Sequence, residues 1–452
     1  MTASEPRTLG SSRPARLRVR WKIFLFLFAF ALIAYLQHTS IAVAGVPMMT
    51  QLALSETQLA WILDAFVVGY TLMQFPGGLL GQRFGARRVL TAIGVVAVVA
   101  MLVMPLAPVL LSGAALFALL FGAQLLLGFA QGPIFPISTG VFEAWFPPYR
   151  WPLVQGVSSL GYQVGAALAP PVISQLMSAF DWQRALIWTT LPALAVIAGW
   201  AWYARNTPAE HPRISTQELT EIGPTATAAT VQAMSWSRMW TLLKDRDVLV
   251  LTLSYLCMNY VFYLLSTFVF LYLVQERHFT LLESGWLAAA PPLAAAVGAG
   301  VGGYGAGVLG RRLGVRRGLR MIPLLSLPAA GVLQYLAVDA ANAYFAVAAL
   351  ALCYACVELN EGPYWAAIMH IGRADAMAAS GVLNTGGNLG GVIGIPIVGY
   401  LAAHHAWTSA FLLGTALAVA SGAAWLLVDP TRRDQRAARA ASQGAGAEAT
   451  TA

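Results

Sequence analysis

The sequence predicts an all-α membrane protein made of two bundles of six transmembrane helices. The chain has 452 residues, of which 58% are hydrophobic and only 10% are charged, so it is far too apolar for an ordinary soluble protein. Its apolar runs are long and continuous, as spanning helices require, and lack the short alternation of barrel strands. A block rich in glycine and arginine at residues 77–89 has a related block at residues 302–317, which indicates two copies of one membrane unit.

The first half contains six predicted spans. A basic tail at residues 1–20 precedes the first span, and Ser55 and Glu56 lie in a short outer loop that caps the second span. The second span ends in a turn that carries Arg83, Arg87 and Arg88. The remaining first-half spans are predicted from length and hydropathy, and together with the first they cover residues 21–45, 89–108, 113–135, 153–177 and 185–203.

A change of composition separates the halves. Residues 204–247 are rich in Thr, Glu, Pro and Arg and read as a polar linker. Six further spans follow, at residues 248–274, 282–308, 319–338, 343–369, 376–401 and 408–428. The predicted domains are therefore the tail 1–20, the bundle 21–203, the linker 204–247, the bundle 248–428 and the tail 429–452.

The basic residues predict the orientation of the spans. If the amino terminus lies inside, Arg184 and Arg277 are the two positions among all Lys and Arg that fall outside. Both termini are then cytoplasmic, in a multi-pass protein of the inner membrane. The formal charge of +8 is dispersed between apolar runs, so it orients helices in the bilayer and does not indicate nucleic acid. We expect a monomer.

Small residues at helical spacing predict close helix contacts. The pairs are Gly161 with Gly165, Gly298 with Gly302, and Gly386 with Gly390. The cysteines indicate no disulfide or metal site, and the sequence contains no recognisable catalytic motif. Cys257, Cys353 and Cys356 lie in apolar runs, where neither a disulfide framework nor a metal site is expected, and the chain has no phosphate-binding loop or catalytic triad pattern. We expect no enzyme activity, no metal and no cofactor.

Longer stretches resemble a known family. Two six-helix halves with the glycine and arginine turn are similar to the major facilitator superfamily. Five stretches look more narrowly like its anion:cation symporter family, of which NTGGNLGG at residues 384–391 is the most specific; they are residues 35–42, 128–136, 165–171, 284–303 and 381–391. The resemblance implies the major facilitator fold with inverted repeats, and transport of sugar acids or other organic anions, typically with protons.

The chain departs from this family at its membrane-embedded charges. Gln37 and His38 stand where the family usually has an Asp-Arg pair, and Gln124 and Gln131 stand where its fourth span has an Arg and a Glu. In the arginine turn Gln82 replaces the usual Asp. The resemblance further implies a cytoplasmic gate at this turn, which we expect to be braced more weakly here; its residues are Gly78, Arg83, Gly85, Arg87 and Arg88.

Ionisable groups within spans are costly and usually face a cavity or a partner. Asp64 lies in the second span, and Glu358 and Glu361 lie three residues apart on one face of the tenth. Burial disfavours the ionised form of a carboxyl group, which suits it to bind and release protons near neutral pH. The candidate proton carriers are therefore Glu361, Asp64, Glu358 and His38, and the alternative is that these groups are satisfied by water or packing.

Polar side chains concentrate on the spans that, in the resembling fold, line a central cavity. Any one such side chain more often forms an interhelical hydrogen bond than a contact with a ligand, and it is their concentration on these spans that indicates a cavity. The predicted cavity residues are Tyr35, Gln37, His38, Tyr70, Gln124, Gln131, Gln163, Asn259, Tyr263, Asn384 and Asn388.

These observations predict a secondary active transporter that moves a small polar solute, such as an organic acid or a sugar-acid-like metabolite, by alternating access. Protons are a candidate co-substrate. Two alternatives stay open, an uncoupled facilitator of a neutral or cationic solute and a transport-dead receptor or sensor.

Overall fold

The structure is a computed structural model that describes residues 18–224, 236–279, 287, 290–432 and 435. Most of the predicted tails 1–20 and 429–452 lies outside the described residues, at residues 1–17, 433–434 and 436–452. The same holds for residues 225–235 of the predicted linker and for residues 282–286, 288 and 289 of the predicted eighth span. The helices of the first half are α1 (Val19–Leu52), α2 (Glu56–Phe84), α3 (Ala86–Leu110), α4 (Gly113–Gln131), α5 (Ile134–Trp145), α6 (Trp151–Ala179) and α7 (Trp182–Tyr203). Those of the second half are α10 (Arg246–Gln275), α12 (Ala290–Leu313), α13 (Val315–Asp339), α14 (Ala343–Glu358), α15 (Glu361–Gly372), α16 (Ala376–Ala403) and α17 (Trp407–Ala424).

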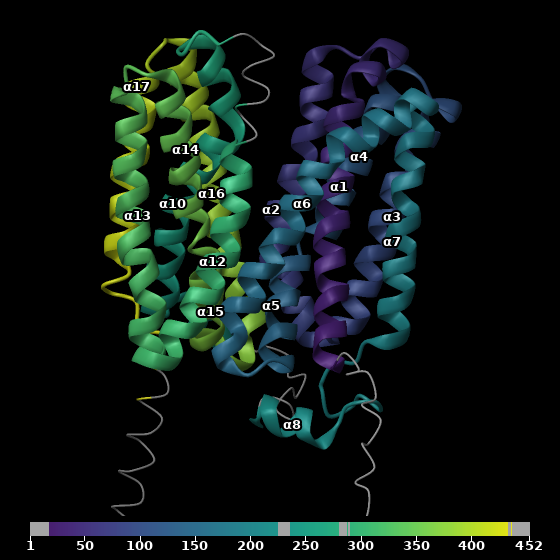
Figure 1. Cartoon of the computed structure of the whole chain (residues 1–452). Coiled ribbons are helices and arrows are strands. Elements are labelled where there is room, and N and C mark those ends of the chain that lie inside the picture. Colours follow the sequence, from purple (N-terminus) through teal and green to yellow (C-terminus); the bar gives the residue numbers. More distant parts are fainter. Residues whose placement is uncertain (1–17, 225–235, 280–286, 288–289, 433–434, 436–452) are drawn as a thin grey trace, which may run out of the picture.

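The helices form two bundles that stand side by side, one from each half of the chain (Figure 1). Ten stretches of the described residues are long and apolar enough to cross a membrane. One of them, Ala343–Ala403, has 61 residues, and it contains α14, α15 and α16, which cross twice. The helix α6 is long enough to span but is less apolar, because it carries Gln155, Ser158, Ser159 and Gln163. The predicted all-helical, two-bundle fold is confirmed.

The repeated glycine and arginine blocks form equivalent tight turns. Gly85 lies between α2 and α3 with φ of 85°, and Gly314 lies between α12 and α13 with φ of 82°. Only glycine adopts this backbone conformation without strain. We call the end of the molecule that carries these two turns and the short linker helix α8 (Thr216–Ile222) the basic face; it is the lower end in Figure 1.

Two predicted spans are broken helices. The fourth span divides into α4 and α5 at Gly132 and Pro133, and it continues to Trp145, ten residues beyond the predicted end. Proline has no backbone N–H to donate, so the regular pattern is interrupted there. The tenth span divides into α14 and α15 at Leu359 and Asn360. Hydropathy is continuous across both breaks, which is why the sequence pattern did not reveal them.

The predicted glycine contacts are confirmed. A Cβ atom on Gly161 or Gly165 would overlap the α1 backbone at Phe28 or Leu32. The other pairs place α12 on the backbone of α14 and α16 on α10; they are Gly298 and Gly302, and Gly386 and Gly390. Such contacts let membrane helices approach closely. This matters in a bilayer, because the hydrophobic effect does not drive helices together there and close packing does.

Ser55 caps α2 as predicted, through a reciprocal pair of hydrogen bonds with Gln58.

The linker is tied to the first span. The beginning of α1 is instead capped from the linker helix α8, because the Glu218 carboxylate accepts hydrogen bonds from the backbone N–H groups of Val19 (3.2 Å) and Arg20 (2.9 Å). Hydrogen bonds from Arg20 and Arg18 lower the pKa of Glu221 in the same helix.

The bundles contact each other on the side of the basic face. The contacts involve α2 and α5 with α16, and α6 with α12 and α15. Near the beginning of α6, Gly156 lies against Gly303 of α12, where either Cβ would meet the facing backbone. Exposed apolar side chains such as Leu168 and Leu293 mark the parts of α6 and α12 farther from this face.

Candidate functional site

A polar cavity lies between the two bundles, and its empty space, counted together with its opening to solvent, is about 430 Å³. The first bundle contributes side chains from α1, α2, α5 and α6, and the second contributes side chains from α10, α15 and α16. The lining residues are Tyr35, Tyr70, Phe135, Tyr162, Tyr255, Asn259, Phe262, Tyr263, Glu361, Trp365, Asn384 and Asn388.

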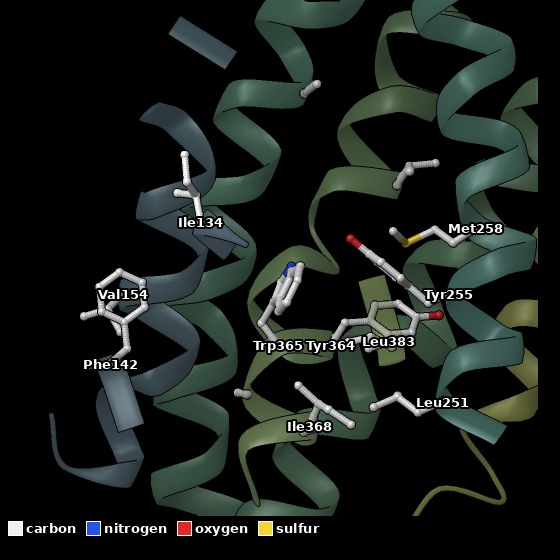
Figure 2. Close-up of a cluster of buried hydrophobic side chains, with 14 of the residues drawn as sticks. Ile134, Phe142, Val154, Leu251, Tyr255, Met258, Tyr364, Trp365, Ile368 and Leu383 are labelled. Carbon is white, nitrogen blue, oxygen red and sulfur yellow. The ribbon is translucent and has the colours of Figure 1, made fainter. Parts of the chain in front are cut away.

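Glu361 is the one charged residue among the described side chains that line this cavity. It begins α15, directly after the helix break, and is 4% exposed. Its Oε1 accepts a hydrogen bond from the Tyr255 hydroxyl (3.1 Å), and its Oε2 accepts one from the Trp365 indole (2.8 Å). Ser159 of α6 lies 3.5 Å from Oε2, across the boundary between bundles. Figure 2 shows the Tyr255 hydroxyl and the Trp365 nitrogen directed toward the same region.

An amide cluster from α10 and α16 forms a second polar part of the wall. The Tyr263 hydroxyl donates to Asn388 Oδ1 at 2.8 Å, and Asn388 Nδ2 donates to the Asn384 carbonyl at 2.8 Å. Asn259 Nδ2 donates to the Tyr255 carbonyl at 2.8 Å, which leaves its Oδ1 for other contacts. The second bundle therefore presents hydroxyl and amide groups already oriented by the protein.

The first bundle presents mainly aromatic rings. Tyr35 and Tyr162 have ring centroids 4.9 Å apart, and Phe135 packs edge-on against Tyr162 at 5.4 Å. Phe135 also stacks on Trp365 of the second bundle at 6.2 Å. The cavity thus has one aromatic wall and one hydrogen-bonding wall with a single carboxyl group.

Several predicted cavity residues lie elsewhere. Gln37 and Gln131 line a separate, smaller cavity in the first bundle, among apolar side chains. Gln131 Nε2 donates to Gln37 Oε1 at 3.2 Å, and Gln131 Oε1 is 3.4 Å from His38 Nδ1. The His38 ring packs between Tyr35 and Phe66. These amides and the imidazole form a chain that leads from the central cavity into the bundle.

The other predicted polar residues line neither cavity. Gln124 is buried in α4, two turns before Gln131, and Asp64 is exposed on α2. Gln163 of α6 faces Glu358, which is fully buried at the end of α14. Glu358 and Glu361 therefore differ in environment although they are three residues apart.

The sequence reasoning did not select five of the lining residues, namely Phe135, Tyr162, Tyr255, Phe262 and Trp365. For Trp365 the sequence does contain a signal. Trp365 follows Glu361 by four residues, so the two share a helical face. An aromatic residue in a membrane span otherwise has no feature that separates a cavity wall from a bundle interior.

The bundles are held together at the basic face by a contact that we call the latch. Met377, at the beginning of α16, lies against three glycines of the first bundle, Gly78, Gly81 and Gly140. Two residues earlier, Asp375 accepts hydrogen bonds from Gln82 (2.6 Å) and from Arg238 of the linker helix α9 (Trp236–Leu243) at 2.8 Å.

The structure places the predicted gate residues at different contacts. Gly78 belongs to the latch, and Gln82 contributes a hydrogen bond in place of an ion pair. Arg87 instead joins α3 to α7, because its guanidinium donates to the Ala201 carbonyl. The Gly85 turn lies against Asn206 after α7, while Arg83 and Arg88 are exposed.

Met377→Ala is expected to weaken the latch. Met377 is partly buried, so we expect a loss of about 1 to 2 kcal/mol of contact energy and a roughly tenfold larger population open at the basic face. Spin labels at the exposed positions Phe84 and Leu313, one at the end of α2 and one at the end of α12, measure that opening in a variant without native cysteines. Met321→Ala, at an exposed position of α13, is the control. Equal distance distributions in both variants would contradict the role of Met377.

Comparison with known proteins agrees with the fold. Residues 26–378 match the family model of the Major Facilitator Superfamily. The chain is 28% identical over 428 residues to the probable sulfoacetate transporter of Cupriavidus necator, covering 92% of this chain and 95% of that protein. It is 26% identical over 402 residues to the hexuronate transporter of Bacillus subtilis, covering 88% and 92% of the two chains. Both relatives are named as transporters and not as enzymes.

Solved structures give the same fold. The fucose:proton symporter of Escherichia coli superposes with a TM-score of 0.68 at 14% identity, over 91% of this chain and all of that chain. The proton:xylose symporter superposes with a TM-score of 0.70 at 15% identity, over 91% of this chain and 96% of that chain.

Two helical bundles around a shared polar cavity define a multi-pass membrane transporter. The match to the family model covers most of the chain, and the chain belongs to the Major Facilitator Superfamily. The resemblance to its organic-anion carriers is also confirmed by the relatives.

Proposed function

We propose that this protein imports a small organic acid, of the size of a sugar acid, across the inner membrane together with a proton. Transport proceeds by alternating access at the cavity between the bundles, and the basic face is cytoplasmic. The closed latch then makes the present arrangement outward-facing. The observation that carries the proposal is Glu361, a lone carboxyl group held by Tyr255 and Trp365 in a cavity whose described lining has no cationic side chain.

This arrangement links an anionic solute to a proton by simple electrostatics. Two carboxylates about 4 Å apart repel by roughly 4 kcal/mol at the effective dielectric of such sites, which is roughly a thousandfold in affinity. A solute anion therefore binds when Glu361 is protonated. Its carboxylate can then accept hydrogen bonds from tyrosine hydroxyls, the asparagine amides and the protonated Glu361 itself.

The relatives support the chemical class of the solute. The proteins from Cupriavidus necator and Bacillus subtilis are named for sulfoacetate and hexuronate, both organic acids. The aromatic wall at Tyr35 and Tyr162 suits the apolar face of a compact carbon skeleton, and the amide wall at Asn384 and Asn388 suits hydroxyl groups.

A second candidate is an uncoupled facilitator of a neutral or cationic solute. The specific observation in its favour is the same lining, in which an ionised Glu361 would attract an amine and repel an acid. The imported class therefore depends on the protonation of one residue.

Uptake into proteoliposomes distinguishes the two candidates. We expect glucuronate, galactarate or sulfoacetate to enter against their gradients when an inward proton gradient is imposed, and neutral sugars and amines to be excluded. The acid should also bind more tightly as the pH falls, because more Glu361 is protonated. Faster entry of amines or neutral sugars would reject the symport proposal in favour of the facilitator. Acid entry that merely equilibrates and ignores the proton gradient would reject the proton coupling.

A further inference from the structure

We propose that Glu358 is a second proton-binding site, one that senses the pH of the cytoplasm and controls opening at the basic face. The inference rests on the alternating access of the proposed function but not on the role of Glu361 as proton carrier. Glu358 is the last residue of α14, it is 0% exposed, and it does not line the central cavity. Neither of its carboxylate oxygens has a hydrogen bond of ordinary geometry among the described residues, and the side-chain donors that face it are Tyr162 and Gln163 of α6.

Close packing keeps water away from Glu358. On one side of it α12 lies directly on the α14 backbone, since a Cβ on Gly298 or Gly302 would overlap the carbonyl of Ala355 or Leu359. On the other side Tyr162 and Gln163 of α6 face it from the other bundle. Tyr162 and Gln163 are neutral donors, and no cationic side chain is among the described groups that act on Glu358. An ionised carboxyl group without a cationic partner in such a place costs several kcal/mol, so this arrangement of the bundles favours protonated Glu358.

The neighbouring titratable groups favour the same state. Those that face Glu358 are Glu361 from α15, Tyr162 from α6, Tyr354 from α14 and Tyr255 from α10, with Tyr35 of α1 contributing electrostatically. The phenols carry no charge near neutral pH, so among these groups Glu361 alone can change charge there. An ionised Glu361 would repel a second negative charge three residues away, which again favours protonated Glu358.

Opening at the basic face would change this environment. The bundles can separate there only if α6 leaves α12 and α15, which breaks the contact of Gly156 with Gly303 and that of Ser159 with Glu361. The helix break is already present beside Glu358, because Asn360 Nδ2 bonds to the carbonyls of Cys356 and Val357 in place of the regular helix pattern. Withdrawal of α6 removes Tyr162 and Gln163 from the carboxyl group and admits water from the cytoplasm.

The sign of the effect follows from linkage. Ionised Glu358 is tolerated in the open, hydrated arrangement and is costly in the closed one, so a rise in pH favours opening at the basic face. The population ratio can change by up to about tenfold per pH unit for one proton. Because the buried group is reached from the cytoplasm, an acid cytoplasm would hold the carrier closed on that side and slow further import of acid.

Distance measurements test the proposal without any solute. Spin labels at Phe84 and Leu313 report opening in nanodiscs between about pH 6 and about pH 8. Solvent-exposed carboxyl groups are already ionised throughout this pH range and do not contribute to the change. We expect the open fraction of the otherwise unmodified protein to rise with pH. Glu358→Gln should remain closed and lose the dependence, because the amide stays neutral, whereas Glu358→Asp should keep it.

Each other outcome overturns the proposal. A pH dependence that survives in Glu358→Gln, or that is missing from the unmodified protein, shows that Glu358 does not control opening. A dependence lost in Glu361→Gln and kept in Glu358→Gln assigns the sensor to Glu361. Failure of the proposed function would be seen separately, as solute uptake that ignores the proton gradient.

Discussion

Glu361→Gln should abolish proton-driven accumulation of the solute while leaving the protein folded. The amide has the same shape as the carboxyl group and can still accept a hydrogen bond from Tyr255 or Trp365. It cannot take up a proton, so the gradient no longer contributes to transport. For coupling to one proton, an inward gradient of about one pH unit supports up to roughly tenfold accumulation, and we expect this ratio to fall to about one.

The measurement is accumulation of labelled glucuronate or sulfoacetate in proteoliposomes at matched protein density. Glu276→Gln, at an exposed position after α10, is the control that keeps accumulation. Asp64→Asn tests the alternative carrier on α2. Retained accumulation in Glu361→Gln, especially with loss in Asp64→Asn, would transfer the proton carrier to the first bundle.

Gly302→Ala should lower the stability of the protein strongly for so small a change. A Cβ atom at Gly302 would overlap the carbonyl group of Leu359, which is backbone at the break between α14 and α15 and cannot rotate away. Overpacking of this kind costs about 1 to 3 kcal/mol, more than the gain of about 1 kcal/mol that alanine brings to a helix. The apparent melting temperature of the purified protein should therefore fall.

Gly310→Ala in the same helix is the matched control. Nothing lies within 4 Å of the Cβ that it would add, so only the helix-forming gain remains and the melting temperature should stay level or rise. Equal effects of the two substitutions would show that α12 does not depend on close contact with the tenth span.

The fold could be predicted in considerable detail. A segment that crosses lipid must satisfy its own backbone hydrogen bonds and present apolar side chains over about 20 residues, so span positions can be read from hydropathy alone. Gly302 and Gly390 were predicted as contact points for the same kind of reason, because a missing side chain is visible in the sequence. The helix breaks at Pro133 and Asn360 were not, since apolar composition continues through them.

The candidate site was less accessible to sequence reasoning. Polar residues in spans are conspicuous, so Tyr35, Asn384 and Glu361 were selected, and the structure places them around one cavity. Gln37 and Gln131 were selected on the same ground, yet they pair with each other inside the first bundle. Polarity indicates that a side chain needs a partner, and it does not indicate whether that partner is a solute or another helix.

The sequence by itself determined the class of protein, the two-bundle architecture, the basic turns and the small residues at which helices touch. Each of these depends on properties of a segment or on the spacing within it. Only the tertiary structure decided that Glu361 accepts a hydrogen bond from Tyr255 of another span, that Glu358 is fully buried, and that Met377 lies among glycines of the opposite bundle. These relations depend on the rotation and mutual position of helices distant in the chain, which are set by packing and leave no local pattern.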